Sequence, residues 1–111
     1  MKFLTITKMK DTAASIPPAL ARQLIEATLA YMNQHKKEGK ILEFYHVPGW
    51  GRFIVISENK SAEEIAQNII GMPTAVITDF EVYPLADFNE SMKMYIETMK
   101  MAETLFPNPS N

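Results

Sequence analysis

The feature that most constrains the fold is a short loop between two strand-like runs. Residues 48–51 read Pro-Gly-Trp-Gly and separate residues 40–47 from residues 52–57. Both flanking runs are enriched in Ile, Phe, Val and Tyr, which favour β-strands. Because only four residues connect the runs and two of them are glycine, the runs are expected to pair as an antiparallel β-hairpin.

Before this hairpin the sequence predicts a strand and then a helix. Residues 2–9 are rich in Phe, Ile and Thr, as in a strand. Pro17 and Pro18 suit the first turn of a helix, where a missing backbone N–H costs little. The next residues carry a broad apolar stripe at helical spacing: Leu20, Leu24, Ile25, Thr28, Leu29, Tyr31 and Met32. Gly39, which can adopt a left-handed backbone, predicts the end of this helix.

After the hairpin the same two patterns return. Ser61 and Glu64 have the spacing of a capping box and predict the start of a second helix, which ends near Gly71. Residues 74–84 then alternate as a strand. One face of that strand is expected to carry Val76, Thr78, Phe80 and Val82, and the other Ile77, Asp79, Glu81 and Tyr83.

The predicted order is β-α-β-β-α-β, which is the ferredoxin-like α+β arrangement. We assign residues 1–86 to this domain. Residues 87–106 are expected to form an added amphipathic helix, capped by Asp87 or Asn89 and packed on the same domain or on a partner. Its apolar stripe comprises Phe88, Met92, Tyr95, Met99, Ala102 and Phe106. Residues 107–111 are expected to be a disordered tail.

Composition excludes several classes of function. The net charge of −2 and the scattered lysines argue against a nucleic-acid surface. The absence of cysteine excludes disulfides and thiol chemistry. No run reaches the length of a membrane span, and the N-terminus lacks the apolar core of a signal peptide, so we expect no membrane partner and a cytoplasmic location.

Two strands are expected to place polar side chains on one face. Alternation puts Glu43 and Tyr45 on one side of residues 40–47, with Leu42, Phe44 and His46 on the other. If Glu43 and Tyr45 share their face with Asp79, Glu81 and Tyr83, that face is too polar for an ordinary core. A cavity enclosed by a dimer would explain it. Desolvation there would raise the pKa of a carboxyl group and suit it to act as a base near neutral pH.

The candidate catalytic residues are therefore Glu81, Glu43 and His46, and the candidate substrate-binding residues are Tyr45, Trp50, Arg52, Asp79 and Tyr83. Arg52 or His46 would bind an anionic group of the substrate. Structural roles remain open for all of them. The glutamates can pair with cations across a dimer, His46 can be a hydrogen-bonded strand residue, and Trp50 can pack against a partner or line a pocket mouth.

The remaining polar residues suggest no cofactor. His35, near a helix end among lysines, is expected to be a solvated residue. The two histidines and the carboxylates show no metal-ligand spacing, so no metal is expected. The glycine-containing loop precedes a strand and not a helix, which argues against a phosphate-binding loop.

Residues 38–85 resemble the muconolactone isomerases. The matching features are Glu-Gly before the second strand, a glycine in the hairpin loop, and Pro73 followed six residues later by Asp-Phe-Glu-Val-Tyr-Pro-Leu over residues 79–85. The family carries a similar Asp-aliphatic-Glu-Val-x-x-Leu run at that spacing. The resemblance implies a dimeric α+β barrel, with a homodimer or a larger ring as the assembly. It also implies cofactor-free isomerisation, in which a proton moves on a small acidic lactone-like metabolite.

The chain also departs from this family in two places. The second strand reads Ile-Leu-Glu-Phe-Tyr-His where the family is rich in Trp, Arg and His, and a Met-rich helix is added at the end. These departures support an alternative, a non-catalytic barrel module that binds a small ligand or only assembles. A cofactor-free oxygenase on the same barrel is a weaker alternative, because it rests on fold analogy alone.

Overall fold

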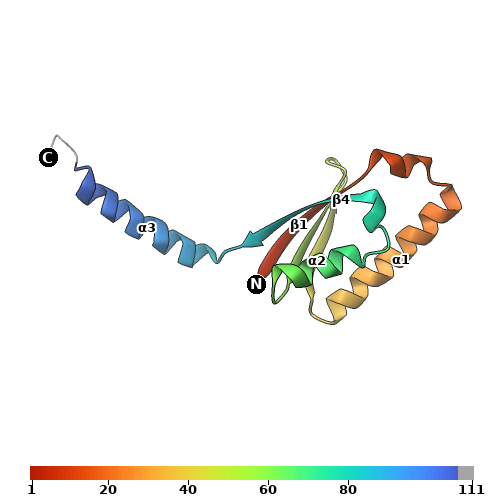
Figure 1. The fold of residues 1–111 in the computed structure, drawn as a ribbon, viewed down its shortest axis with the longest axis horizontal. Coiled ribbons are helices and arrows are strands. Elements are labelled where there is room, and N and C mark those ends of the chain that lie inside the picture. Colours follow the sequence, from red (N-terminus) through yellow and green to blue (C-terminus); the bar gives the residue numbers. More distant parts are fainter. Residues whose placement is uncertain (108–111) are drawn as a thin grey trace.

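The computed structural model describes residues 1–107 as a four-stranded antiparallel sheet with two helices on one face and a third helix standing apart (Figure 1). The strands are β1 (Lys2–Met9), β2 (Ile41–Val47), β3 (Arg52–Glu58) and β4 (Thr78–Leu85). The helices are α1 (Pro18–Lys37), α2 (Ala62–Ile70) and α3 (Phe88–Leu105), with short 3₁₀ helices at Asp11–Ser15 and Ala75–Ile77.

The strand order β2-β3-β1-β4 confirms the predicted ferredoxin-like α+β fold. The register aligns Thr5 with Val55 of β3 and with Val82 of β4, and Phe44 with Val55. These residues lie on the face that α1 and α2 cover, which we call the covered face. The neighbouring residues point to the opposite side, which none of the described helices covers and which we call the open face.

The local signals that predicted the hairpin and the helix ends are confirmed. In the loop, the Gly51 N–H donates to the Val47 carbonyl at 2.9 Å, and Gly51 takes a φ of 66° that disfavours residues with a side chain. Gly39 has a φ of 80° just after α1. Ser61 Oγ accepts from the Glu64 N–H at 3.2 Å, while the Glu64 carboxylate accepts from the Lys60 N–H at 2.7 Å.

The predicted start of the last strand is wrong by four residues. The strand begins at Thr78, and Ala75–Ile77 form a 3₁₀ turn that leaves Val76 82% exposed. The Thr74 carbonyl holds this turn, because it accepts from the Ile77 N–H at 3.1 Å and from the Thr78 hydroxyl at 2.7 Å. From Thr78 onward the predicted alternation holds, since Phe80 and Val82 lie opposite Thr7 and Thr5 on the covered face.

The core between sheet and helices is small. Its buried apolar residues are Phe3, Ile41, Val55 and Ile65. Polar residues are buried beside them: Thr5, Thr7, Ser57, Asn59, Thr74 and Thr78. Small hydroxyl side chains on the covered face cannot reach α1, so space remains between this helix and the sheet.

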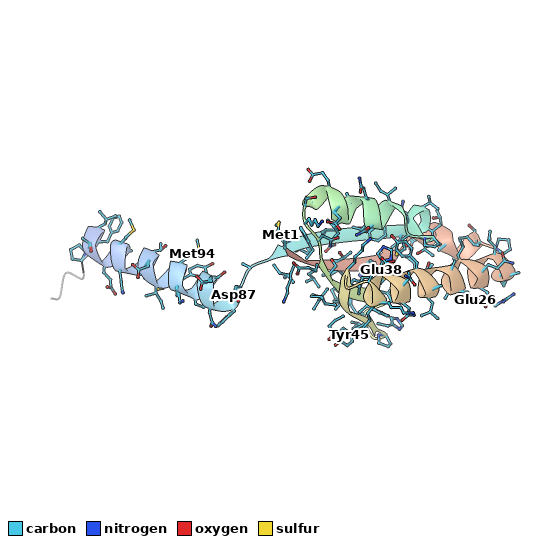
Figure 2. All side chains as sticks on the ribbon, turned by 90° about the horizontal axis from the view of Figure 1, so that it is seen from below. Met1, Glu26, Glu38, Tyr45, Asp87 and Met94 are labelled. Carbon is cyan, nitrogen blue, oxygen red and sulfur yellow. The ribbon has the colours of Figure 1, made fainter. Side chains whose placement is uncertain are left out.

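Helix α3 extends away from the rest of the chain (Figures 1 and 2). The molecule measures 71 × 30 × 22 Å, and its radius of gyration of 20.0 Å exceeds the roughly 13 Å expected for a compact chain of this length. Asp87 caps the helix, because its carboxylate accepts from the Glu90 N–H at 3.0 Å. Most of the apolar stripe is exposed, including Phe88 at 72% and Tyr95 at 64%. The predicted disordered tail, apart from Pro107, lies outside the described residues.

Candidate functional site

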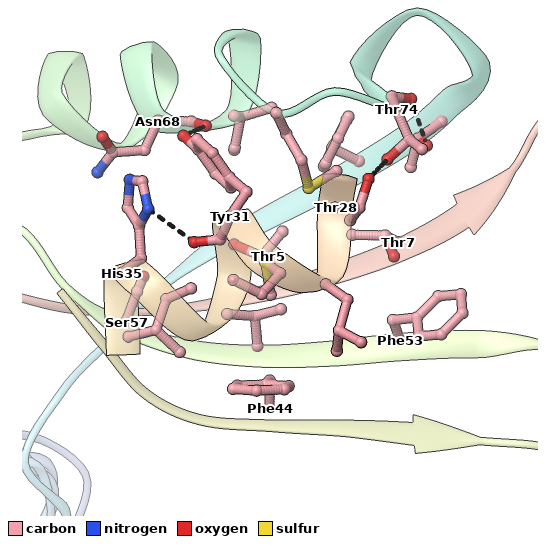
Figure 3. Close-up of a pocket in the computed structure, with 18 of the residues that line it drawn as sticks. Thr5, Thr7, Thr28, Tyr31, His35, Phe44, Phe53, Ser57, Asn68 and Thr74 are labelled. Carbon is pink, nitrogen blue, oxygen red and sulfur yellow. Dashed lines mark hydrogen bonds between the residues drawn. The ribbon is translucent and has the colours of Figure 1, made fainter. Parts of the chain in front are cut away.

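A cavity of about 450 Å³ lies between the covered face of the sheet and helices α1 and α2 (Figure 3). Its wall is mainly apolar, with Phe44, Val55 and Ile65 among the lining residues. Its polar part consists mostly of neutral groups, including the hydroxyls of Thr5 and Thr7. None of the residues that line it, within the described part of the chain, is an aspartate or glutamate. The cavity therefore suits a small, largely apolar molecule.

A hydrogen-bond network closes one end of this cavity. The Asn59 amide donates to the Ser57 hydroxyl at 3.0 Å, and the Asn68 amide donates to Asn59 Oδ1 at 2.9 Å. The Tyr31 hydroxyl then donates to the main-chain carbonyl of Asn68. Figure 3 shows this last bond, which ties α1 to α2. Because the network links β3, α2 and α1 in turn, it fixes the height of the cavity at this end.

His35 belongs to the same end of the cavity, although it was expected to be a solvated residue. It is half-buried, and its Nδ1 lies 3.0 Å from the Tyr31 carbonyl oxygen (Figure 3). Since that carbonyl can only accept, Nδ1 carries the proton. Burial raises the pKa of the Tyr31 hydroxyl, and the negative charge of Glu38 adds to this effect. The hydroxyl of Tyr31 therefore remains a neutral donor.

Threonine hydroxyls line another part of the cavity wall. The Thr28 hydroxyl of α1 donates to the Thr74 hydroxyl at 3.2 Å, and the Thr78 hydroxyl donates to the Thr74 carbonyl at 2.7 Å (Figure 3). The first bond joins the middle of α1 to the turn before β4, and the second stabilises that turn. Together with the bond from Tyr31 to Asn68, these polar contacts hold α1 above the sheet in a region where few apolar side chains pack.

Several lining residues of α1 and of the covered face are exposed, and we call them the cavity mouth: Met9, Ile25, Leu29, His46 and Phe53. Ile25 and Leu29 are 56% and 58% exposed, although both are apolar. His46 stacks on Phe53, with ring centroids 4.7 Å apart and planes 19° from parallel. His46 is thus the candidate catalytic residue that the structure places in the cavity wall.

The other candidates that belong to strands lie on the open face. On β2 the Tyr45 hydroxyl donates to a Glu43 carboxylate oxygen at 2.8 Å, and on β4 the Tyr83 hydroxyl donates to a Glu81 carboxylate oxygen at 2.9 Å. In each pair this hydrogen bond is the main cause of a raised tyrosine pKa, and the negative charge of the glutamate adds to it. All four residues are exposed in the single chain.

A smaller polar hollow of about 150 Å³ lies at the hairpin end of the open face. Its charged lining residues are Lys8, Arg52, Asp79 and Glu81. Lys8 and Asp79 are opposite each other in the pairing of β1 with β4. Arg52 Nη1 donates to the Trp50 carbonyl at 3.0 Å, and its guanidinium lies 5.3 Å from the centre of the Trp50 ring. Trp50 and Arg52 therefore stabilise each other in the loop.

The sheet divides the predicted site into two groups. The register confirms that Glu43 and Tyr45 share a face with Asp79, Glu81 and Tyr83, and that His46 lies on the other. Sequence reasoning missed the cavity and its polar residues Asn59 and Asn68. One signal was available, because the covered face of β1 carries Thr5 and Thr7 where a filled core would have large apolar side chains.

Among residues 1–107 we find no group of three or more His, Cys, Asp or Glu residues placed to hold a metal ion. Within the same residues, no helix has both the length and the apolar character needed to cross a membrane.

Comparison with known proteins identifies the family. The family model described as muconolactone delta-isomerase matches residues 1–91. The chain belongs to the muconolactone isomerase family. This confirms the resemblance seen in residues 38–85 and extends it through β1 and α1. Most of α3 lies beyond the part of the chain that the family shares.

The fold of the family is confirmed by a solved structure, reported as the crystal structure of muconolactone isomerase at 3.3 Å resolution. It superposes with a TM-score of 0.69 at 21% sequence identity, over 78% of this chain and 90% of that chain. At this identity the match shows the fold alone. A comparison with curated protein sequences finds no match.

Proposed function

We propose that the protein is a cofactor-free isomerase that moves a proton on a small acidic lactone-like metabolite, with the ring of the substrate in the cavity. Membership of the muconolactone isomerase family supports the reaction class. The cavity of about 450 Å³ supports the substrate class, because sites for small molecules commonly occupy 300–1,000 Å³ and are mostly apolar.

The observation that carries this proposal is the position of His46 in the cavity wall, stacked on Phe53. Histidine is the side chain most often used for proton transfer near neutral pH. In the proposed step, the imidazole takes a proton from a ring carbon conjugated with the lactone carbonyl, and the electron pair moves to the carbonyl oxygen. The same proton returns at another carbon, so the double bond shifts and the carbonyl re-forms. No oxidant or covalent intermediate is needed.

The wall also offers groups that can stabilise the enolate. Thr5 and Thr7 are buried, and their hydroxyls border the cavity on the covered face. Hydroxyl donors directed at a developing oxyanion lower the barrier to such a reaction. Lys40 lines the cavity and its side chain is 42% exposed, so the carboxylate of the substrate is expected to lie near this cation, in contact with water.

We further propose that the open faces of two copies meet as a homodimeric α+β barrel, which can assemble into a larger ring. Supporting this, the centre of the open face is apolar, with Leu4, Ile6, Ile54 and Ile56 only half-buried in the single chain. In this dimer Glu43 and Glu81 would either pair with cations of the other copy or face a shared polar chamber. The second arrangement would give them a role in catalysis.

A non-catalytic function at the same cavity is the second candidate. The observation that favours it is the lack of any carboxylate among the lining residues of the described chain, which leaves a weakly polar wall. Such a wall suits a neutral apolar ligand as well as a lactone ring.

One experiment separates these functions. Conversion of muconolactone is followed by NMR for the natural chain, His46→Gln and Glu81→Gln, and binding is titrated for each. We expect His46→Gln to lower kcat by about 10²–10⁴-fold, the usual effect of losing a general base, while binding changes little. Glu81→Gln should retain activity within a few-fold. Loss of activity in Glu81→Gln alone would move catalysis to the open face, and binding without conversion by the natural chain would favour the second candidate.

A further inference from the structure

The polar end of the cavity holds a histidine whose second ring nitrogen has no protein partner. The Nδ1–H of His35 donates to the Tyr31 carbonyl at 3.0 Å, and within the described part of the chain Nε2 forms no hydrogen bond. Nε2 is not sealed off either, since residues 1–107 contain no buried side-chain nitrogen or oxygen that lacks a partner. His35 also lines the cavity. Its Nε2 is therefore available to a ligand, as an acceptor or, once protonated, as a donor.

The groups that face this ring from its own helix turn, from α2 and from β3 are neutral. The His35 ring lies against Tyr31, with ring centroids 4.0 Å apart and planes 34° from parallel. Asn68 of α2 lies on the other side of the ring (Figure 3). The amides of Asn68 and Asn59 are bonded to each other and to Ser57. Since none of these neighbours carries a charge, the protonation of the ring depends on charges elsewhere.

Those charges come from the end of α1 and the residues just after it. His35 is in the last turn of α1, where the negative end of the helix dipole favours a positive ring. Glu38 acts in the same direction. The pKa of Glu38 is lowered mainly by the hydrogen bond from Gln34, and the positive charges of Lys40 and His35 add to this effect. The lysines at this end act in the opposite direction: Lys36, Lys37 and Lys40. A ligand carboxylate placed here would favour the protonated ring.

Lys40 is the cation that can receive such a carboxylate. It lines the cavity, and its ammonium lies 3.5 Å from the Glu38 carboxylate, with both side chains 42% exposed. An ion pair this long and this exposed is weak, so the ammonium can exchange Glu38 for a ligand. The backbone keeps Lys40 beside His35, because the Lys40 N–H donates to the His35 carbonyl at 2.9 Å. Both side chains therefore border the same end of the cavity.

We propose that His35 and Lys40 form a carboxylate subsite at this end of the cavity, and that His35 takes up a proton from solvent at Nε2 when the carboxylate binds. Nδ1 keeps its bond to the Tyr31 carbonyl in both protonation states, so the ring need not move. By linkage, affinity for the carboxylate rises as the pH falls toward the range in which histidine is protonated. The inference rests on the proposed function in one respect, that an acidic ligand enters this cavity, and it requires no turnover.

The test uses 4-phenylbutyrate as the acidic probe and the uncharged 4-phenylbutanamide as its matched control. Both are titrated into the natural chain between about pH 6 and pH 8, where histidine changes its charge and a carboxylic acid does not. We expect the affinity for the acid to rise about three-fold or more as the pH falls, and the affinity for the amide to stay constant. The chain has two histidines, so ¹⁵N NMR of the rings can follow each one. On binding the acid, His35 should become protonated and His46 should keep its charge.

A conservative variant separates the ring nitrogen from the structural bond. His35→Asn removes Nε2 and keeps a side-chain N–H for the Tyr31 carbonyl. The same helix already contains such a bond, because the Asn33 amide donates to the Leu29 carbonyl, also four residues earlier, at 2.9 Å. We expect His35→Asn to abolish the pH dependence of acid binding and to leave amide binding unchanged. His35→Gln repeats the measurement if this variant does not fold.

Two further variants complete the test. Lys40→Met should weaken binding of the acid at every pH, while His46→Gln should preserve its pH dependence. Equal affinities for acid and amide, or no binding of the acid, would overturn the subsite. Binding of the acid without protonation of His35 would overturn the proton uptake, and a pH dependence lost in His46→Gln alone would assign it to the cavity mouth instead. Conversion of muconolactone is not measured, so the outcome is separate from that of the isomerase assay.

Discussion

Tyr83 donates a hydrogen bond from its hydroxyl to Oε2 of Glu81, two residues earlier on β4, at a distance of 2.9 Å. Tyr45 and Glu43 form the same pair on β2, at the other edge of the sheet. Each pair keeps a carboxylate and a phenol together on the open face. The pairs thus frame the apolar centre of that face on both sides.

The first prediction concerns the titration of Tyr83. Its pKa is raised because the hydroxyl donates to Glu81 and because the carboxylate is negatively charged. In Glu81→Gln the charge is lost, and we expect the pKa of Tyr83 to fall toward its ordinary value of 10.0. Tyrosine ring signals followed by NMR measure this. Tyr45 in the same variant is the control, and a parallel fall of its pKa would contradict this account.

The second prediction concerns the bond that joins α1 to α2. Tyr31→Phe removes the donor to the Asn68 carbonyl and leaves that acceptor without its partner. We expect the free energy of unfolding to fall by about 1 kcal/mol. Urea denaturation measures the loss. Tyr45→Phe removes an exposed bond of the same kind and should change stability by less than about 0.5 kcal/mol. Equal losses of unfolding free energy in the two variants would show that the Tyr31 bond does not hold α1 over the cavity.

The third prediction follows from the raised pKa of Tyr31. Burial favours its neutral hydroxyl in the folded chain, while in the unfolded chain the group loses its proton near pH 10.0. The stabilisation is therefore complete below pH 10 and is lost as the pH rises through the folded pKa. Denaturation on both sides of pH 10 should show a steeper decline for the natural chain than for Tyr31→Phe. Parallel declines would exclude a contribution from this residue.

The fourth prediction tests the cavity itself. Val55 lies on its floor, between Phe44 and Thr5 in the sheet, so Val55→Phe places a larger apolar group in the empty space. We expect the affinity for a small lactone to fall at least ten-fold, while stability is retained because a void is being filled. Ile54→Phe puts the same side chain on the open face and should leave affinity unchanged. The reverse result would place the ligand on the open face.

Much of the fold could be predicted because it is encoded locally. The capping box at Ser61, the left-handed Gly39 and the loop at residues 48–51 each depend on the chemistry of a few adjacent residues. The start of β4 was misplaced because turn bonds to the Thr74 carbonyl override the strand pattern of residues 74–77. Alternation still gave the correct faces from Thr78 onward.

The candidate site was harder to predict than the fold. Its cavity depends on the height of α1 above the sheet, which contacts such as Tyr31 with Asn68, 37 residues apart, set only after folding. Alternation correctly separated His46 from Glu43, but it could not show that an empty space lies on the side of His46. Likewise, periodicity predicted the amphipathic helix α3 without showing that it stands apart from the sheet in the single chain.

The central claim is that the ligand occupies the space between the covered face and α1. Backbone NMR of the natural chain, titrated with muconolactone, tests it most directly, because neighbouring residues report on opposite faces. We predict saturable shifts centred on Thr5, His46 and Val55, with small changes at Glu81 and Tyr83. Shifts centred on Arg52, Glu81 and Tyr83, with Thr5 and Val55 unaffected, would contradict the account.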